Sequence, residues 1–448
     1  MEQLQKKYGF WTATAMVVGI VIGSGVFFKA DDVLKAAGGS LPTALIAWLI
    51  GGAIMVVTAY VFAHIATRVN KVNGLVDYFE MAYGVRAGYL VAWFMTFIYY
   101  PTLVSVLAWV SARYTAGLIG WEAGLWPLSW FYLLLFFALN ILSPILAGKW
   151  QVTATAIKLV PLVLIAIIGG IGGLMSGQTV QSFSVSAQSV AGSGGGLALA
   201  TLSTAFAYEG WIIATSINAE LQDAKRTLPR ALVFGTILVA LIYIIYYLGI
   251  SGILSNDQVL AAGDNAPVEV MAVVIGPIAG TVLSLFVIVS CLGTLNGLVM
   301  GCCRGMYSIA SRGLGPKAHT FSVVNKTTNS TVPSALLGLV LSILWMIVWY
   351  GNFNGWWGGF MDISELPIAF IYVIYTSLYL WVMRTFTDLG PVGRFATPLL
   401  ATAGSLYIIW GAVQKDMFLT FLLVTLVFTG LGLLLLGANR VTNPDKPA

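Results

Sequence analysis

The chain has 448 residues, of which 59% are hydrophobic and only 9% charged, a composition typical of an integral membrane protein. The net charge of +5 accompanies apolar segments along the whole chain, so it does not indicate nucleic-acid binding. The sequence contains no HExxH, P-loop, GxSxG or CxxC motif, and therefore offers no basis for enzyme chemistry, a cofactor or a metal site.

Apolar segments of membrane-spanning length recur from one end of the chain to the other. Each reaches or approaches the roughly 20 residues that a helix needs to cross a bilayer. They cover residues 11–28, 41–66, 88–111, 126–147, 152–175, 197–217, 230–254, 271–303, 332–350, 364–383, 396–413 and 416–437. The sequence therefore predicts an all-α membrane protein with twelve transmembrane helices and both termini on one side.

The basic residues predict the orientation of these helices. Most Lys and Arg residues fall on the side of the termini, and the opposite side receives only Lys29, Lys35, Arg113 and Lys415. Basic loops stay in the cytoplasm, so the tails 1–10 and 438–448 are expected there, with the protein in the cell membrane.

The first apolar segment is interrupted at its centre by Gly23-Ser24-Gly25. A broken helix survives in hydrocarbon only where its freed backbone groups line a cavity or meet a ligand. The break also creates a new helix N-terminus, whose free N–H groups suit a carboxylate. The alternative is that the glycines only permit close packing between helices.

Lys158 lies about eight positions into the fifth segment, with no acidic residue near it in sequence. A lysine at membrane depth costs roughly 2.5–3.5 kcal/mol on insertion scales, so it is expected to face the protein interior. There its ammonium would donate to carbonyls freed by the break in the first helix, in place of a sodium ion. The alternative is that the side chain extends to the cytoplasmic interface.

A second candidate break, Phe206-Ala207-Tyr208-Glu209-Gly210, lies in the sixth segment. Breaks five segments apart indicate two groups of five helices that enter the membrane from opposite sides, as in secondary transporters built from inverted repeats. The repeats would be 11–175 and 197–383, with 396–437 outside them. The stretches 178–196 and 255–268 are expected to be external loops.

Three side chains near the second break are candidates for a role in the site. Glu209 is either a structural acceptor for exposed N–H groups or a gate close to the substrate. Phe206 precedes the break and is a candidate lid. Tyr243, in the seventh segment, either offers its hydroxyl to the site or simply packs in the core.

With these motifs the chain resembles the amino acid–polyamine–organocation superfamily and, within it, the L-amino-acid transporter family, notably bacterial exchangers of the alanine–serine–cysteine type. The resemblance covers about residues 8–440. It is carried by Val21-Ile22-Gly23-Ser24-Gly25-Val26-Phe27, Phe206-Ala207-Tyr208-Glu209-Gly210-Trp211, Ala156-Ile157-Lys158-Leu159 and Gly74…Tyr78…Tyr83-Gly84.

The resemblance implies a LeuT-like fold with a five-plus-five inverted repeat and discontinuous helices 1 and 6. It implies that N–H groups of Ser24, Gly25 and Val26 bind the substrate carboxylate. It also implies that the ammonium binds to carbonyl groups, namely those of Val21, Phe206, Ala207 and Glu209. Animal members carry a cysteine between spans three and four for a glycoprotein partner; residues 112–126 contain none, so no disulfide-linked heavy subunit is expected.

The predicted function is sodium-independent exchange of small neutral L-amino acids by alternating access, with Lys158, Tyr243 and Gly23 serving the mechanism. Proton-coupled uptake, with Lys158 or Glu209 as the titrating group, is the alternative. A channel would need a ring of polar residues along a pore, and a substrate sensor would need a soluble domain that the short tails cannot supply. The sequence therefore favours transport.

Overall fold

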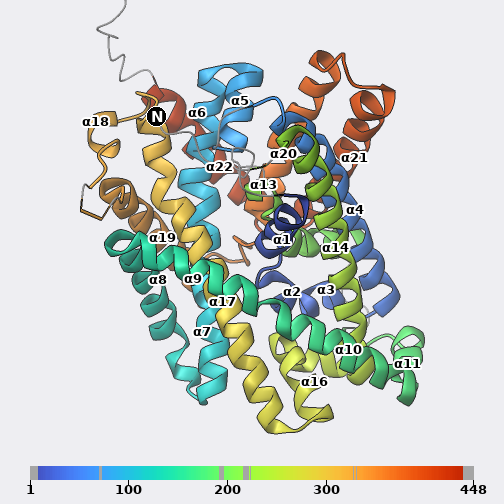
Figure 1. Ribbon diagram of the computed structural model, residues 1–448. Coiled ribbons are helices and arrows are strands. Elements are labelled where there is room, and N and C mark those ends of the chain that lie inside the picture. The colour runs from blue at the N-terminus through green and yellow to red at the C-terminus, as the bar shows by residue number, and fades with distance from the viewer. Residues whose placement is uncertain are drawn as a thin grey trace, which may run out of the picture.

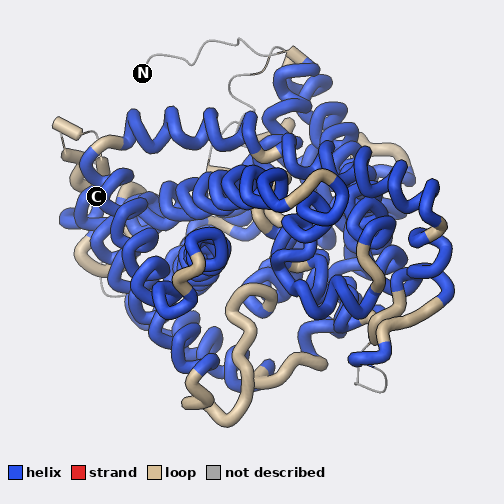
Figure 2. The backbone as a smooth tube through the Cα atoms, turned by 90° about the horizontal axis from the view of Figure 1, so that it is seen from below, coloured by secondary structure: helices blue, strands red, loops and turns tan. Residues whose placement is uncertain are grey.

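The computed structural model describes residues 9–69, 73–190, 196–214, 221, 223–325, 327–328 and 330–436, and the regular elements of that part of the chain are helices (Figures 1 and 2). Among these residues, ten helical stretches are long and apolar enough to cross a membrane. They are built from α4 (Leu41–Ala66), α6 (Val85–Phe94) with η1 (Met95–Tyr99) and α7 (Tyr100–Ile119), α8 (Leu125–Leu142), α9 (Pro144–Ile157) with α10 (Leu159–Ser176), α14 (Ala224–Ile253), α17 (Pro277–Ala310), α19 (Val332–Phe353), α20 (Leu366–Thr385), α21 (Thr397–Val413) and α22 (Phe418–Leu436).

The remaining two spans are discontinuous, as the sequence predicts. The first is divided into α1 (Phe10–Val21), α2 (Gly25–Phe28) and α3 (Ala30–Ala36), and the sixth into α12 (Leu197–Tyr208) and α13 (Trp211–Ala214). Ile22 ends α1 in an extended conformation (φ −66°, ψ 105°), and Glu209 does the same after α12 (φ −73°, ψ 159°). Gly210 follows with φ 107°, a conformation that residues with a side chain rarely adopt.

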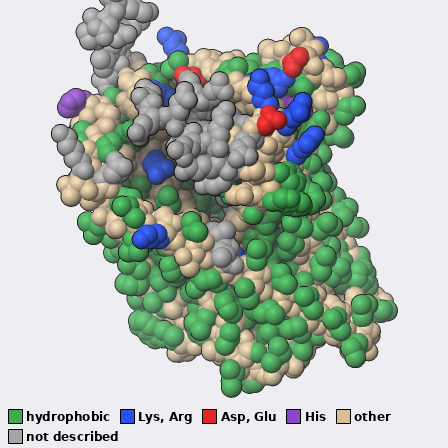
Figure 3. Space-filling view, viewed as in Figure 1, with side chains coloured by type: hydrophobic (Ala, Val, Ile, Leu, Met, Phe, Trp, Pro, Cys, Tyr) green, Lys and Arg blue, Asp and Glu red, His purple; other side chains and the backbone are tan. Residues whose placement is uncertain are grey.

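Short helices cover the two ends of the bundle (Figure 1). We call the end with α5 (Leu75–Tyr83) and α18 (Ala318–Phe321) the upper face. The opposite end, with α11 (Gln178–Ser184) and α16 (Ala266–Val274), is the lower face. In the space-filling view of Figure 3, Lys and Arg side chains gather towards the upper face, and apolar side chains cover most of the molecule below them.

Helices α10 and α14 pack with their backbones almost in contact. A Cβ atom at Gly169 would lie 2.1 Å from the carbonyl oxygen of Gly249, and one at Gly173 would lie 2.4 Å from the Cα atom of Gly252. Small residues let transmembrane helices approach this closely. The consequence for the site is that α10, which follows Lys158, is locked to α14, which carries Tyr243.

Several predicted boundaries are wrong, and each has a local cause. The fifth span begins at Pro144 rather than near 152, since α8 ends at Leu142 and proline is favoured in the first turn of a new helix. The predicted eighth span, 271–303, merges α16 with α17; Gly276, with φ 126°, and Pro277 separate them. The predicted external loops contain α11 and α15 (Asn256–Ala262).

Candidate functional site

The two helix breaks lie against each other in the middle of the molecule. A Cβ atom built on Gly25 would lie 2.6 Å from the Cα atom of Ala207 and 3.0 Å from Cδ1 of Phe206. Only glycine leaves room for this approach. The first N–H groups of a helix have no acceptor within it, so the N-terminus of α2 presents donors next to the carbonyl end of α12.

Tyr243 joins the carbonyl ends of both broken helices. Its hydroxyl oxygen lies 3.3 Å from the carbonyl oxygen of Val21 and 3.2 Å from that of Ala207. The side chain is fully buried, and its ring stacks on Tyr208 with centroids 5.2 Å apart. Val21 and Ala207 are two of the carbonyls expected to accept from a substrate ammonium, so the phenol marks one boundary of that position.

Lys158 lies at the joint between α9 and α10 and points into the protein. Its residue is 2% exposed, and Nζ donates to the carbonyl oxygen of Gly19 over 3.5 Å. Because α1 ends at Val21, this carbonyl belongs to the last turn, whose oxygens have no donor within the helix. On the other side α17 covers the stem, since a Cβ on Gly293 would lie 3.4 Å from Lys158 Cε.

Glu209 is held by two tyrosines from other helices. Its Oε1 accepts a hydrogen bond from the Tyr99 hydroxyl at 3.1 Å and from the Tyr375 hydroxyl at 3.4 Å. Tyr99 ends the π-helical turn η1, a feature that is rare and frequent at functional sites. Glu209 Oε2 is buried and has no hydrogen-bond partner among the residues that the structure describes. The side chain therefore connects the second break to η1 and α20.

Phe206 lies between the breaks and the lower face. Its ring meets Phe28 edge-on with centroids 5.0 Å apart, and Nζ of Lys29 lies 5.8 Å from its ring centroid. Lys29 stands directly between α2 and α3. The aromatic pair therefore separates the unwound segments from the charged groups beyond them.

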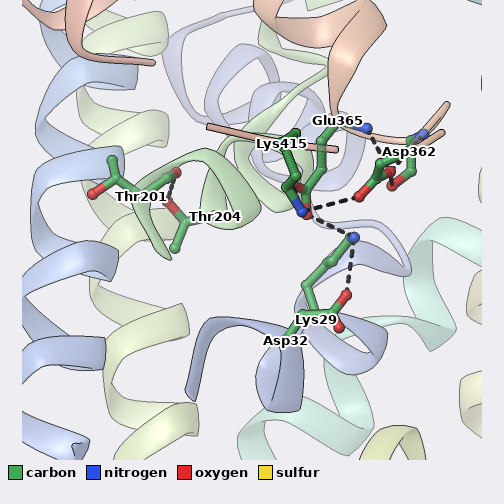
Figure 4. Close-up of polar contacts among 8 residues, drawn as sticks. Lys29, Asp32, Thr201, Thr204, Asp362, Glu365 and Lys415 are labelled. Carbon is green, nitrogen blue, oxygen red and sulfur yellow. Dashed lines mark hydrogen bonds and ion pairs between the residues drawn. The ribbon is translucent and has the colours of Figure 1, made fainter. Parts of the chain in front are cut away.

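Those charged groups form an ion-pair cluster, which we call the lower cluster: Lys29, Asp32, Asp362, Glu365 and Lys415 (Figure 4). Lys29 pairs with Glu365 at 2.8 Å, although the two residues are 3% and 0% exposed. Lys415 pairs with the other oxygen of Glu365 at 2.7 Å. Separating buried partners is costly, because each charge is left without compensation. The cluster therefore holds α3 against the start of α20 and the end of α21.

The upper face has its own ion pairs. Arg312, after α17, lies 2.6 Å from Asp77 and 3.2 Å from Glu80, both in α5. A cavity of about 210 Å³ lies beside this contact, between α5, η1 and α17. A larger cavity of about 440 Å³ opens at the lower face around Asp31, Arg113 and the lower cluster. The paired breaks lie between the two cavities, and ion pairs lie beside each cavity.

All the residues predicted for the site lie on the two breaks or on helices packed against them. They are Val21, Gly23, Ser24, Gly25, Val26, Lys158, Phe206, Ala207, Glu209 and Tyr243. Sequence reasoning missed Tyr99, Tyr375 and the lower cluster. It also missed Thr294, whose Oγ1 would lie 3.1 Å from a Cβ on Gly23. The sequence signal that could have indicated the lower cluster is Lys29, a cation only four residues after Gly25.

The fold has a solved counterpart. A crystal structure titled as MhsT in complex with L-phenylalanine aligns over 97% of this chain and 99% of the other, with a TM-score of 0.53 and 16% sequence identity. At this identity the likeness concerns the fold alone, which is LeuT-like.

Relatives in sequence are amino-acid transporters. The serine/threonine exchanger SteT of Bacillus subtilis is 30% identical over 422 residues, which is 92% of this chain and 92% of that protein. Human large neutral amino acids transporter small subunit 2 is 30% identical over 78% of this chain and 67% of its own length. The mouse b(0,+)-type amino acid transporter 1 is 28% identical over 79% of this chain and 74% of its own. A family model described as amino acid permease matches residues 8–437. The chain thus belongs to the amino acid permease family, and its relatives named here are transporters rather than enzymes.

Proposed function

We propose that the protein is a sodium-independent exchanger of small neutral L-amino acids that works by alternating access. The observation that carries this proposal is the contact between the two breaks, where donors of α2 meet acceptors of α1 and α12. An amino acid needs both, because its carboxylate accepts hydrogen bonds and its ammonium donates them. Helix ends at the membrane midplane are suited to this task.

In the proposed complex, N–H groups of Ser24, Gly25 and Val26 bind the carboxylate. The ammonium donates to carbonyl oxygens of the broken helices, those of Val21, Phe206, Ala207 and Glu209. Phe206 covers the substrate on the side of the lower face, where its ring already packs against Phe28. Gly23 gives α1 the freedom to unwind before the carboxylate site.

Lys158 supports the sodium-independent part of the proposal. Its ammonium lies next to a freed carbonyl of α1, the kind of acceptor that would otherwise attract a small cation. From the positive-inside bias we propose that the protein lies in the cell membrane with its upper face, which carries most basic residues, towards the cytoplasm and its lower face towards the outside. We propose that the protein acts without a disulfide-linked heavy subunit.

Small neutral amino acids should compete best for the site. The backbone provides for both charged ends of the substrate, but a charged side chain would enter a buried pocket at a cost of several kcal/mol without a partner. In competition with labelled serine, alanine and serine are expected to inhibit at concentrations at least about tenfold below those of arginine, lysine or glutamate. A preference for arginine would contradict this and make the carboxylate of Glu209 the counter-charge for the substrate side chain.

Uptake into proteoliposomes distinguishes exchange from the alternative function, which is proton-coupled uptake. Labelled serine should enter quickly only when the vesicles contain unlabelled amino acid, and replacing sodium with choline should change nothing. Proton-coupled uptake is favoured by Glu209, a buried carboxylate whose Oε2 has no hydrogen-bond partner among the residues that the structure describes, because such a group can exchange a proton during the cycle. Uptake into empty vesicles that follows an imposed pH gradient, and is lost in Glu209→Gln, would establish proton coupling instead.

A further inference from the structure

A network of buried amide side chains joins α17 to the helices on either side of the corner between α8 and α9. Asn296 of α17 is fully buried, and its Oδ1 accepts a hydrogen bond from Nδ2 of Asn140, in α8, at 3.0 Å. Its Nδ2 donates to the carbonyl oxygen of Ala147 and to Oε1 of Gln151, both in α9, each at 3.0 Å. One side chain therefore fixes two helices on α17.

The face of α9 that meets α17 is also the face that leads to Lys158. Four residues follow one another at spacings of four, three and four positions, which places them on one side of the helix: Ala147, Gln151, Ala154 and Lys158. A Cβ atom on Gly293 of α17 would lie 2.6 Å from Cβ of Ala154 and 3.4 Å from Cε of Lys158. The surface that holds α9 on α17 thus extends as far as the lysine.

The joint between α9 and α10 is weakened by a proline. Pro161 has no N–H group, so it leaves the carbonyl group of Ile157 without its usual helical donor. Lys158 stands directly between the two helices, after the end of α9 and before the start of α10. The glycine contacts with α14 lie on α10. The direction of α9 therefore depends on contacts of its own, and the amide network is among them.

The contact of Lys158 with α1 is sensitive to the direction of α9. Its Nζ lies 3.5 Å from the carbonyl oxygen of Gly19, which is longer than most N–H···O hydrogen bonds. The stem of the side chain has little freedom to compensate, because the residue is buried and Gly293 lies against it. A rotation or a slip of α9 on α17 would therefore break the contact with α1.

From this geometry we propose that Asn296 and Gln151 are positioning residues for transport, which fix α9 on α17 so that Lys158 reaches the end of α1. Asn140 holds the amide group of Asn296 in the orientation that turns its donors towards α9. Asn296 and Gln151 act through Lys158 and not on the substrate. This inference rests on the role proposed above for Lys158 in alternating-access exchange.

A double-mutant cycle in the exchange rate tests whether Asn296 acts through Lys158. Asn296→Leu removes the amide group and keeps a side chain of similar length. In the otherwise wild-type chain it should slow serine exchange about tenfold, the scale of one lost hydrogen bond to a charged group. In the Lys158→Ala chain it should slow exchange less than about twofold, because no lysine is left to position. Independent substitutions would instead act by the same factor in both chains.

Asn352→Leu is the matched control for this cycle. Asn352 is also a buried amide with two hydrogen bonds, since its Nδ2 donates to the carbonyl oxygen of Met361 at 2.7 Å and its Oδ1 accepts from the N–H of Met361 at 3.1 Å. It lies near the end of α19, and α9 takes no part in these two bonds. Its effect on the exchange rate should be the same factor with and without Lys158.

Gln151→Leu provides a second route if Asn296→Leu does not reach the membrane. It removes one acceptor from the same network and leaves α17 unchanged. Its effect on the exchange rate should depend on Lys158 in the same way as that of Asn296→Leu. An effect of either variant that is equal in the two chains would overturn the inference.

The same cycle in the melting temperature, measured in detergent without amino acid, separates the positioning of Lys158 from transport. Lys158→Ala should lower the Tm of the wild type at least about twice as much as it lowers the Tm of Asn296→Leu or Gln151→Leu, in which the lysine contact is already lost. This result together with no exchange by the wild type would uphold the positioning and refute the proposed function. Equal decreases in Tm in the two chains would refute the positioning, whatever the exchange rate.

Discussion

A Gly25→Leu variant is expected to fold and reach the membrane but to lose at least about 99% of amino-acid exchange. Even the first atom of the new side chain would lie 2.6 Å from the Cα atom of Ala207, and that neighbour is backbone, which cannot rotate away. The breaks must therefore move apart. Losing two hydrogen bonds to a charged carboxylate, at about 1.5 kcal/mol each, weakens binding roughly a hundredfold.

Gly170→Leu is the matched control for this substitution. Gly170 also lies within a transmembrane helix, α10, but a Cβ atom there meets no atom within 4 Å. Both variants should give the same yield and the same size-exclusion profile in detergent, whereas only Gly25→Leu should lose exchange in proteoliposomes. Gly25→Ala should be intermediate, since its methyl group makes the same close contact without the branched remainder. Full activity of Gly25→Leu would refute the assignment of the site to the breaks.

The sequence alone locates the two breaks because their chemistry is local. Gly23 and Gly25 within an apolar span, and Glu209-Gly210 within another, are poor choices for a continuous helix in lipid, whatever the rest of the fold. Lys158 could be located in the same way, because a charge at membrane depth requires an internal partner. The sequence does not say which carbonyl group is that partner; in the structure it is the carbonyl group of Gly19.

The lower cluster could not be derived in this way. Lys29 and Glu365 are 336 positions apart, and no local pattern distinguishes Glu365 from the other acidic residues near the ends of spans. The sequence also gives no sign of the π-helical turn η1, since Met95–Tyr99 is mostly apolar and continues an ordinary helix at both ends. Both features arise from packing between spans, which helical periodicity and charge counts do not encode.

The predicted start of the fifth span is wrong because a basic residue does not have to end a membrane span. The sequence predicts a fifth span that begins at 152, after the basic residue Lys149; the helix begins at Pro144 and continues through Lys149. An exposed lysine can extend along the helix to the interface, so its presence does not end the span. The same property is what made Lys158 ambiguous from the sequence.

Replacing Lys158 by alanine is expected to slow exchange about ten- to hundredfold while some substrate binding remains. A hydrogen bond that involves a charged group contributes about 1.5–3 kcal/mol, and this one joins the last turn of α1 to the joint between α9 and α10. The residues proposed to touch the substrate stay in place in Lys158→Ala. The loss should therefore appear in the conformational cycle rather than in the binding site itself.

Lys149→Ala is the control, because Lys149 lies nine positions earlier on the same helical stretch and is exposed. The two variants should express equally, and Lys149→Ala should exchange serine at the wild-type rate. The informative measurement is the apparent affinity for serine on each face of oriented proteoliposomes. A ligand or contact shifts an equilibrium between two states only by the difference in its interaction with them.

Locking of α10 to α14 through Gly169 and Gly249 makes this difference possible. If α1 moves relative to that pair as one face opens, the distance from Lys158 to Gly19 changes, and the contact stabilises one state more than the other. Lys158→Ala should then raise the apparent affinity for serine on one face and lower it on the other. The wild type should show no response to sodium. The opposite outcome is a Lys158→Ala variant with a normal exchange rate and with wild-type affinities for serine on both faces. It would mean that the ammonium stabilises both states alike, and the proposed replacement of a sodium ion by Lys158 would have to be abandoned.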